Sequence, residues 1–368
     1  MSKTLVLGDP HLSAETDWQA ETGRRIINWL EGLEINNENN ELILVGDLVD
    51  RYAFSPPSIN LVVQFLRACR FHTVHMVVGN HDISKMEEES QQYVAYAFAP
   101  QMDSRFKIYE YPTTFRSSGL DVVTLPFYLA PTHSLVDLKP ESSPMERWGI
   151  DYTKSYDVCI AHHFLKSSLS KNIPEELAVD VEALLPNVKK TLAGHIHTAE
   201  LSPDQYTGSL YPKKIDEEGM RFYWVYDSDT DKWKKWPTPK FCELHTITYG
   251  EKIPYEITEN RLPVYSVIKA PSKEKAFDYY KGQGYIRKVF TSWDNIRGGQ
   301  GFGEMNPAYY SMNNQAMIPK HELLSRFETL LLEEQQEWKK FEVTKDTLKK
   351  AVDVIKRTTK EAPASQQG

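Results

Sequence analysis

The sequence is poor in cysteine, has no long apolar run and carries no excess of positive charge. Its three cysteines, Cys69, Cys159 and Cys242, are odd in number and far apart, which argues against a disulfide framework and against a thiolate zinc site. No apolar stretch approaches the roughly 20 residues that a membrane helix needs, and the first residues lack the zones of a signal peptide. The net charge of −8 gives no general attraction to nucleic acid or membrane. We therefore expect a cytoplasmic globular protein without membrane association.

What the sequence does contain is an alternation of apolar strands and amphipathic helices. Strands are expected at 4–7, 41–45 and 73–78, and helices at 16–33 and 58–69. This alternation predicts an α/β fold in which a loop follows the carboxyl end of each strand. Apolar runs at 122–125, 158–161 and 191–193 predict further strands of the same core, and residues 221–234 predict a hairpin that turns near Asp229.

At 368 residues the chain is longer than a single core usually allows, so two or three domains are expected. We predict a main domain over 1–250, a small strand–helix–strand cap over 251–293, a flexible linker over 294–319, a helical module over 320–358 and a disordered tail over 359–368. The two helices of the module have apolar stripes but little core of their own. Such stripes indicate a partner protein, and the alternative is packing against the main domain.

Five polar clusters follow predicted strands. They are DPH at 9–11, GDLVD at 46–50, GNHD at 79–82, HH at 162–163 and GHIH at 194–197. Each cluster alone is explained as well by turn chemistry or by an ordinary core or surface histidine. Together they lie where ligands converge in an α/β protein, in the crevice at the carboxyl ends of the strands. The clusters therefore predict one functional site.

These motifs, in this order, resemble those of the calcineurin-like metallophosphoesterases. The resemblance implies a β-sandwich flanked by helices, with four layers α/β/β/α, and a centre for two divalent metal ions. The first ion would be held by Asp9, His11, Asp47 and His197, and the second by Asp47, Asn80, His162 and His195. Asp47 would bridge the ions, and His163 is the alternative to its neighbour His162.

Two ions that share a carboxylate can hold a hydroxide nucleophile and neutralise phosphoryl oxygens. Imidazole, carboxylate and amide ligands without thiolate suit manganese, iron or zinc better than copper(I); the family resemblance implies Mn²⁺. His81, next to the ligand Asn80, is the expected general acid for the leaving oxygen. Asp82 is expected to hold that imidazole by a hydrogen bond, to cap a helix over 83–89, or both. Asp50 is expected to support the ligands by hydrogen bonding.

The stretch "YTGSLYPKKIDEEGMRFYWVYD" at 206–227 resembles an element of the SbcD-type nucleases, the bacterial relatives of the Mre-type nuclease. The order of the modules is similar to that of phage-encoded recombination subunits of this family. The resemblance implies a DNA exonuclease and endonuclease that forms a homodimer and acts in DNA end processing, recombination and repair, in the host cytoplasm if phage-encoded. Residues 320–358 would bind the coiled coil of an SbcC-type ATPase. The alternatives are a phosphoesterase for a nucleotide or phosphoprotein, and a DNA-end scaffold with a vestigial metal site.

Overall fold

A computed structural model describes residues 2–50, 55–84, 93–127, 149–151, 153–168, 178–198, 205–213, 217, 219–248, 262 and 264–269. The predicted linker 294–319, helical module 320–358 and tail 359–368 lie outside these residues, as does the predicted cap except for 262 and 264–269. Within the described ranges, no helix has the length and apolar character needed to cross a membrane.

The first sheet contains most of the strands predicted in the amino-terminal half. Its strands are β1 (Lys3–Leu7), β2 (Glu41–Leu44), β3 (Thr73–Val77), β6 (Phe106–Tyr109), β13 (Phe222–Asp227) and β14 (Lys232–Pro237), in the order β14-β13-β1-β2-β3-β6. β1, β2, β3 and β6 are parallel, and the β13–β14 hairpin joins antiparallel to β1. The predictions for 4–7, 41–45, 73–78 and the hairpin are confirmed.

The strands predicted at 122–125, 158–161 and 191–193 also form, but they build a second sheet. This sheet has the order β12-β9-β8-β7, with β7 at Thr113–Ser117, β8 at Leu120–Leu125, β9 at Val158–Ala161 and β12 at Thr191–Ala193. Val6, Ile43 and Val77 of the first sheet pack in one buried cluster with Val122 and Ile160 of the second. The two sheets therefore share a core, as strands with apolar side chains on both faces require.

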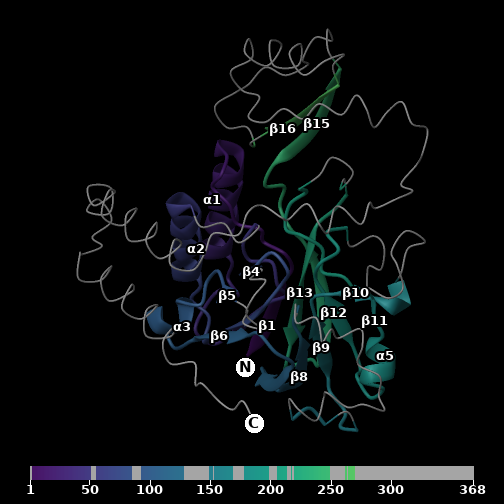
Figure 1. The fold of residues 1–368 in the computed structure, drawn as a ribbon. Helices are drawn as coiled ribbons and strands as arrows, with labels where there is room; N and C mark the ends of the chain where they lie inside the picture. Colours follow the sequence, from purple (N-terminus) through teal and green to yellow (C-terminus); the bar gives the residue numbers. More distant parts are fainter. Residues whose placement is uncertain are drawn as a thin grey trace, which may run out of the picture. The chain divides into compact units, whose positions relative to one another are not determined.

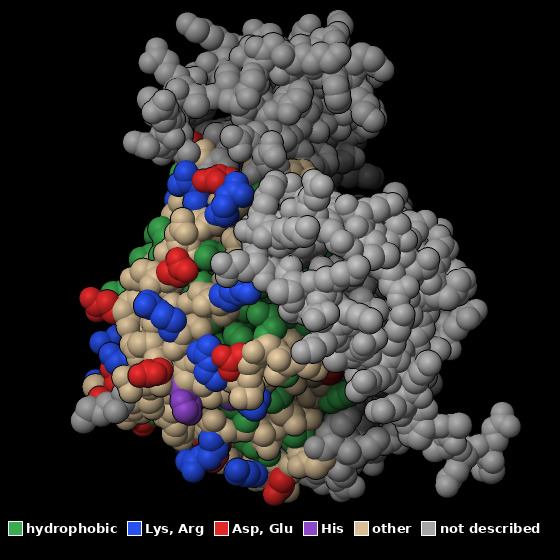
Figure 2. Space-filling model, turned by 90° about the vertical axis from the view of Figure 1, so that its left-hand side faces the viewer, with side chains coloured by type: hydrophobic (Ala, Val, Ile, Leu, Met, Phe, Trp, Pro, Cys, Tyr) green, Lys and Arg blue, Asp and Glu red, His purple; other side chains and the backbone are tan. Residues whose placement is uncertain are grey.

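Helices cover the outer faces of the two sheets (Figure 1). α1 (Asp17–Gly32) and α2 (Pro56–Ala68) pack on the first sheet, and the short α5 (Val181–Leu184) packs on the second. The expected four layers, α/β/β/α, are thus present. The face on the α1–α2 side carries basic and acidic side chains interspersed with one another (Figure 2).

α2 shows how the sequence fixes these elements. Ser55 caps the helix by accepting a hydrogen bond from the Ser58 backbone N–H at 3.3 Å, and proline occupies the first helical positions. Leu61, Phe65 and Leu66 recur at helical spacing and are buried against the sheet. The predicted helix at 58–69 is therefore confirmed, with its start two residues earlier.

Several short elements complete the described structure. α3 covers Ala99–Met102, and a 3-10 turn covers Lys166–Ser168. β4 (Ile83–Ser84) pairs antiparallel with β5 (Tyr93–Val94), while β10 (Phe164–Leu165) pairs parallel with β11 (Ala178–Val179). β15 (Glu243–Thr248) and β16 (Val264–Lys269) also pair in parallel. A strand was predicted at the position of β16, and the other predicted elements of the cap lie outside the described residues.

The helix predicted from residue 83 is wrong where the structure describes it. Ile83 and Ser84 are extended and pair with Tyr93 and Val94, so the chain enters a hairpin directly after GNHD. The pairing supplies backbone hydrogen-bond partners that a helix would otherwise provide.

Candidate metal centre

The seven predicted ligands come from loops at the carboxyl ends of strands in both sheets. Asp9 and His11 follow β1, Asp47 follows β2, and Asn80 follows β3. In the second sheet His162 follows β9, and His195 and His197 follow β12. Because both sheets bring these strand ends to the same region, side chains separated by up to 188 positions meet there.

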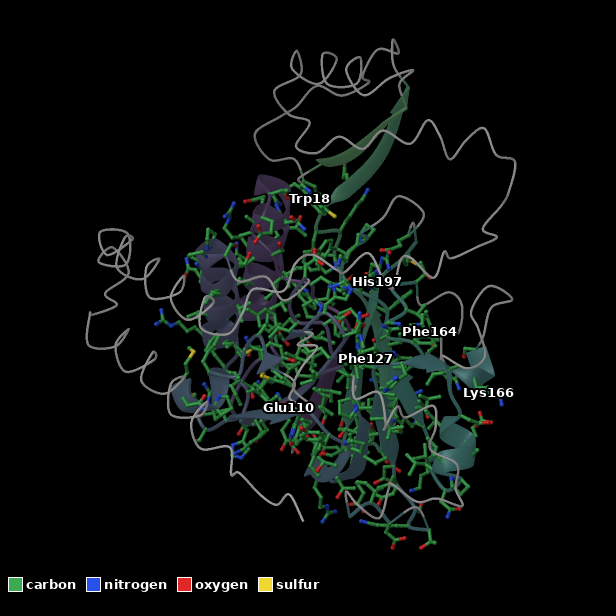
Figure 3. All side chains as sticks on the ribbon, in the orientation of Figure 1. Trp18, Glu110, Phe127, Phe164, Lys166 and His197 are labelled. Carbon is green, nitrogen blue, oxygen red and sulfur yellow. The ribbon has the colours of Figure 1, made fainter. Side chains whose placement is uncertain are left out.

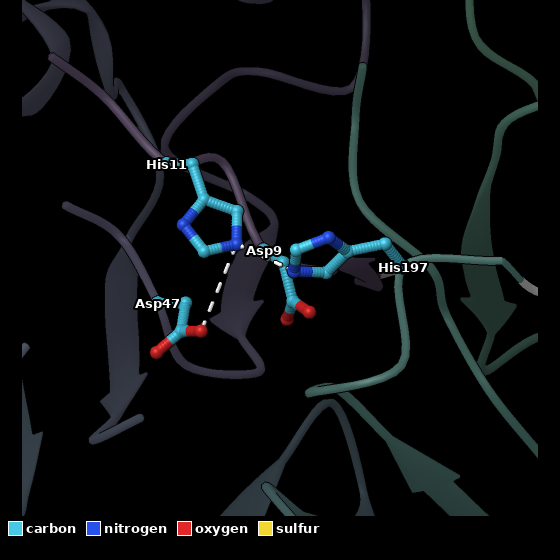
Figure 4. A group of neighbouring side chains, drawn as sticks. All are labelled: Asp9, His11, Asp47 and His197. Carbon is cyan, nitrogen blue, oxygen red and sulfur yellow. Dashed lines mark hydrogen bonds and ion pairs between the residues drawn. The ribbon is translucent and has the colours of Figure 1, made fainter. Parts of the chain in front are cut away.

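The first group contains Asp9, His11, Asp47 and His197 (Figure 4). One ligand atom from each lies within 4.8 Å of all the others. The Nε2 atoms of His11 and His197 are 2.9 Å apart, and His11 Nε2 is 3.7 Å from Asp47 Oδ2. These are the residues that the resemblance assigns to the first ion.

The second group meets around the side-chain oxygen of Asn80. Asn80 Oδ1 lies 3.1 Å from His162 Nε2 and 2.7 Å from His195 Nδ1. His162 Nε2 is also 3.3 Å from Asp47 Oδ2, so Asp47 contacts both groups. His163 turns away and makes a hydrogen bond of 3.0 Å with the Pro126 carbonyl oxygen. Of the two adjacent histidines, His162 is the one that joins the group.

The chemistry of these residues fits divalent metal ions. Asp9 Oδ2 accepts a hydrogen bond from the His195 backbone N–H at 2.8 Å, but Asp9 Oδ1 is buried without a hydrogen-bond partner. An unsatisfied carboxylate oxygen is costly in the protein interior, and a bound cation would compensate it. The oxygen and imidazole donors, with no thiolate among them, suit a hard or borderline ion.

The backbone at the site is held in a sparsely populated conformation. Asp9, His11, Asp47 and His195 have positive φ angles of 32°, 45°, 48° and 77°. Left-handed conformations are uncommon for residues other than glycine, and they concentrate at functional sites. Here they turn each side chain sharply inward from the end of its strand.

Two glycines of the motifs make room for the ligands. A Cβ atom on Gly46, whose φ is 99°, would collide with the His162 ring, and one on Gly79 would collide with the Asp47 carboxylate. The glycines of GDLVD and GNHD are therefore required by close approach as well as by the turn.

Burial and neighbouring carboxylates together set the charges of the predicted ligands. Burial raises the pKa of Asp9, and it lowers the pKa of both His11 and His195. Neutral imidazoles keep a lone pair for a metal ion at neutral pH. For His162 burial acts in the same direction, but the Asp47 carboxylate outweighs it and raises the pKa to about 10. A metal ion must displace this proton.

His81 lies at the edge of the first group. Its ring contacts the His11 ring edge to face at 4.9 Å, and its side chain is 23% exposed. Its backbone N–H donates to Asp47 Oδ1 at 2.8 Å, so the position of His81 is tied to that of a predicted ligand. An imidazole that borders the centre and reaches solvent is suitably placed for proton transfer.

The carboxylate beside His81 is that of Asp50, and the expectation that Asp82 holds the imidazole is wrong. Asp50 Oδ1 lies 3.5 Å from His81 Nδ1. Asp82 is fully buried and accepts hydrogen bonds from the backbone N–H groups of Val49 and Gly79 and from the Tyr96 hydroxyl. Asp82 therefore ties the GDLVD and GNHD loops together, and it is followed by a strand rather than capping a helix.

Three supporting residues lie beyond the five motifs. Glu217 Oε1 is 2.8 Å from His197 Nδ1, and the Tyr211 hydroxyl donates to the His11 carbonyl oxygen at 2.8 Å. Lys213 Nζ is 2.5 Å from Asp50 Oδ1 and 3.2 Å from His11 Nδ1. Although burial acts in the opposite direction, the Lys213 ammonium holds the pKa of Asp50 well below its usual range. All three belong to the stretch at 206–227, but no pattern within that stretch marks them as partners of residues in the five motifs.

Two aromatic side chains, Phe127 and Phe164, border the second group; both are labelled in Figure 3. The Phe164 ring packs edge to face against His195 at 4.3 Å, and the Phe127 ring lies 6.1 Å from it. Both phenylalanines are half-buried. They shield one side of His195 from water, consistent with the lowered pKa of that imidazole.

A two-sheet α/β fold whose strand ends bring together carboxylate, imidazole and amide side chains is suited to a metal-dependent hydrolase. The family model of the calcineurin-like phosphoesterases matches residues 2–199, and the chain belongs to this family. It is accordingly a metal-dependent phosphoester hydrolase. Among curated proteins, none matches the chain.

Proposed function

We propose that this protein is a DNA phosphodiesterase, with exonuclease and endonuclease activity, that works with an SbcC-type ATPase in DNA end processing, recombination and repair in the cytoplasm. The observation that carries the proposal is the position of the "YTGSLYP" segment, which resembles an SbcD-type element. The Ser209 backbone N–H donates to the His197 carbonyl oxygen at 3.1 Å, and the Tyr211 hydroxyl donates to that of His11. The nuclease-like segment is thus in direct contact with the metal centre.

Two divalent ions, proposed to be Mn²⁺, would supply an activated water and positive charge for the phosphoryl oxygens when bound by Asp9, His11, Asp47, Asn80, His162, His195 and His197. Orientation of the reacting groups and proton transfer belong to the protein's own side chains. With its Nδ1 facing Asp50, His81 has its Nε2 available to donate a proton to the leaving oxygen of the phosphodiester. Lys213 in turn fixes Asp50.

The substrate class is tested with the purified full-length chain and Mn²⁺. Linear duplex DNA is compared with p-nitrophenyl phosphate, a small monoester, and with bis-p-nitrophenyl phosphate, a small diester. We expect degradation of the duplex and of the small diester, with both activities abolished by EDTA. Hydrolysis of the small esters without any cleavage of DNA would reject the nuclease and favour a nucleotide or phosphoprotein substrate. No hydrolysis of any ester would favour a scaffold with a vestigial site.

The ATPase partner is proposed to bind residues 320–358, which lie outside the described structure. The support is the pair of apolar stripes in the sequence, which includes Leu323, Phe327 and Leu331 in the first predicted helix and Leu348 and Ile355 in the second. A chain truncated after Ala316 is expected to lose co-purification with an SbcC-type ATPase and to keep hydrolysis of the small diester. Unchanged co-purification would reject this docking site. A homodimer, the oligomeric state that we propose, is checked by light scattering on the same sample.

A further inference from the structure

Glu217 is a buried carboxylate directly behind the first ligand group. It lies outside residues 2–199, the part of the chain that the family model matches. Its side chain is 9% exposed, and its Oε1 is 2.8 Å from Nδ1 of His197. The other nitrogen of that ring, Nε2, faces Nε2 of His11. Glu217 and the candidate ion site thus lie on opposite sides of one imidazole.

The two oxygens of Glu217 have different partners. Oε2 accepts a hydrogen bond of 2.7 Å from the Lys213 backbone N–H and lies 4.0 Å from the Arg221 guanidinium. The same guanidinium donates to the carbonyl oxygens of Glu217 and His197. The carboxylate is therefore fixed through Oε2, so that Oε1 is held in place for the imidazole.

The surroundings of Glu217 favour an ionised carboxylate, since Oε2 accepts a hydrogen bond from the Lys213 backbone N–H and the Arg221 guanidinium lies beside it. An ionised carboxylate has only acceptors, so the hydrogen between Oε1 and Nδ1 is donated by the imidazole. This leaves the Nε2 lone pair directed at the first ligand group.

His162 provides an internal comparison. Its Nδ1 is 2.7 Å from the Val45 carbonyl oxygen, and its Nε2 faces Asn80 and Asp47. Both histidines therefore have an acceptor on Nδ1 that directs Nε2 to the centre. For His162 the acceptor belongs to the backbone, whereas for His197 it is a side chain that can be exchanged.

We propose that Glu217 is a positioning residue for the first metal ion, because it fixes the orientation of the His197 ring and the ring nitrogen that carries hydrogen. The ligand class is a divalent cation held through His197 Nε2. The inference rests on His197 being a metal ligand, and it is independent of whether the substrate is DNA. Partners behind ligating histidines typically change metal affinity by 10–100-fold.

The test measures Mn²⁺ binding to the full-length apoprotein by calorimetry, with metal content determined by mass spectrometry. E217M, which keeps the size of the side chain but removes both acceptors, is expected to weaken one binding event by about 10–100-fold and to leave the other unchanged. E217Q keeps an acceptor oxygen and is expected to retain most of the affinity. E182Q, on the exposed face of α5, is the matched control and should bind like wild type.

A double-mutant cycle separates positioning from a merely structural role. In an H197A background the E217M effect on Mn²⁺ affinity should disappear, since the imidazole to be positioned is missing. An equal effect in both backgrounds, or wild-type affinity in E217M, would overturn the inference. If E217M does not fold, the Mn²⁺ affinity of E217D tests the inference instead. Its shorter side chain keeps the charge but withdraws it from the ring, so wild-type affinity in E217D would overturn the inference as well.

Wild-type protein that binds no Mn²⁺ would instead reject the metal centre itself. Binding of Mn²⁺ without cleavage of DNA would reject only the proposed substrate, and the Glu217 inference would stand. Failure of the metal centre, of the DNA substrate and of the Glu217 inference can therefore be distinguished in one set of samples.

Discussion

Replacing His81 by serine is expected to abolish proton donation without emptying the metal centre. The His81 side chain is not among the predicted ligands, and its contact with Asp47 is made by the backbone N–H, which serine retains. The imidazole is 23% exposed and contacts His11 and Asp50, so its removal leaves a small opening at the edge of the site rather than a cavity in the core. The loss should therefore fall on catalysis.

The size of the effect depends on the leaving group. General acid catalysis typically contributes 10²–10⁴-fold, or about 2.7–5.4 kcal/mol. DNA cleavage expels an alkoxide, which needs a proton, and its kcat should fall by this factor. p-Nitrophenolate is a stable anion that leaves without a proton, so bis-p-nitrophenyl phosphate should be hydrolysed by H81S at nearly the wild-type rate. Steady-state kinetics on both substrates measure the difference, and mass spectrometry should find the wild-type metal content.

The matched control is H72S. His72 is exposed and precedes the amino end of β3, whereas GNHD follows the carboxyl end of that strand, so this change is expected to leave both rates unchanged. Equal losses on the two substrates would refute proton donation by His81. Loss of bound metal in H81S would refute the argument as well, since it would make His81 part of the ion site.

Three further predictions concern the ligands and their surroundings. H162N is expected to lose the second ion, as metal analysis would reveal. H163N should keep both ions but lose about 1–3 kcal/mol of stability in thermal melts, because its hydrogen bond to Pro126 is lost. The reverse pattern would mean that His163, and not His162, is the ligand. G46A is expected to displace the His162 ring and weaken Mn²⁺ binding, and calorimetry that finds wild-type affinity would contradict the close approach. Because the pKa of His162 is raised to about 10, metal binding at pH 7–9 should release a proton, and affinity should rise by up to about tenfold per pH unit. Calorimetry in buffers of different ionisation enthalpy measures this release, and its absence would contradict the charge assigned to His162.

The strands and the grouping of the predicted ligands could be predicted because both depend on local sequence patterns. Apolar runs such as 158–161 and 191–193 correspond to strands residue for residue, and each polar cluster begins where its strand ends. A parallel strand must deliver the residues after its carboxyl end to one edge of its sheet. That rule, applied to Asp9, Asp47 and Asn80, is enough to predict from the sequence that they lie together.

The features that escaped prediction depend on contacts between distant segments. Asp82 is predicted to cap a helix because aspartate is favoured at the N-cap position, yet pairing of the next residues with Tyr93 and Val94 extends the chain. Glu217 lies in a run of acidic residues that is typical of a solvated surface, and only the folded chain shows it behind His197. Tertiary context overrode local propensity at Asp82. At Glu217 the stretch 206–227 drew notice as a whole, but nothing in it indicated which residue lies beside His197.

Because the strands are divided between two sheets, formation of the metal centre depends on how these sheets pack. Each predicted ion takes ligands from both sheets: His197 joins Asp9, His11 and Asp47, while His162 and His195 join Asp47 and Asn80. The apolar cluster between the sheets, which includes Val6 and Ile160, must therefore be packed before either set is complete. A bound ion would in turn link the two sheets, because it would satisfy groups such as Asp9 Oδ1 that are otherwise buried without a hydrogen-bond partner. Metal affinity and the packing of the two sheets are thus expected to be coupled, since the sheet core also holds the strained backbone of Asp9, His11, Asp47 and His195 in place.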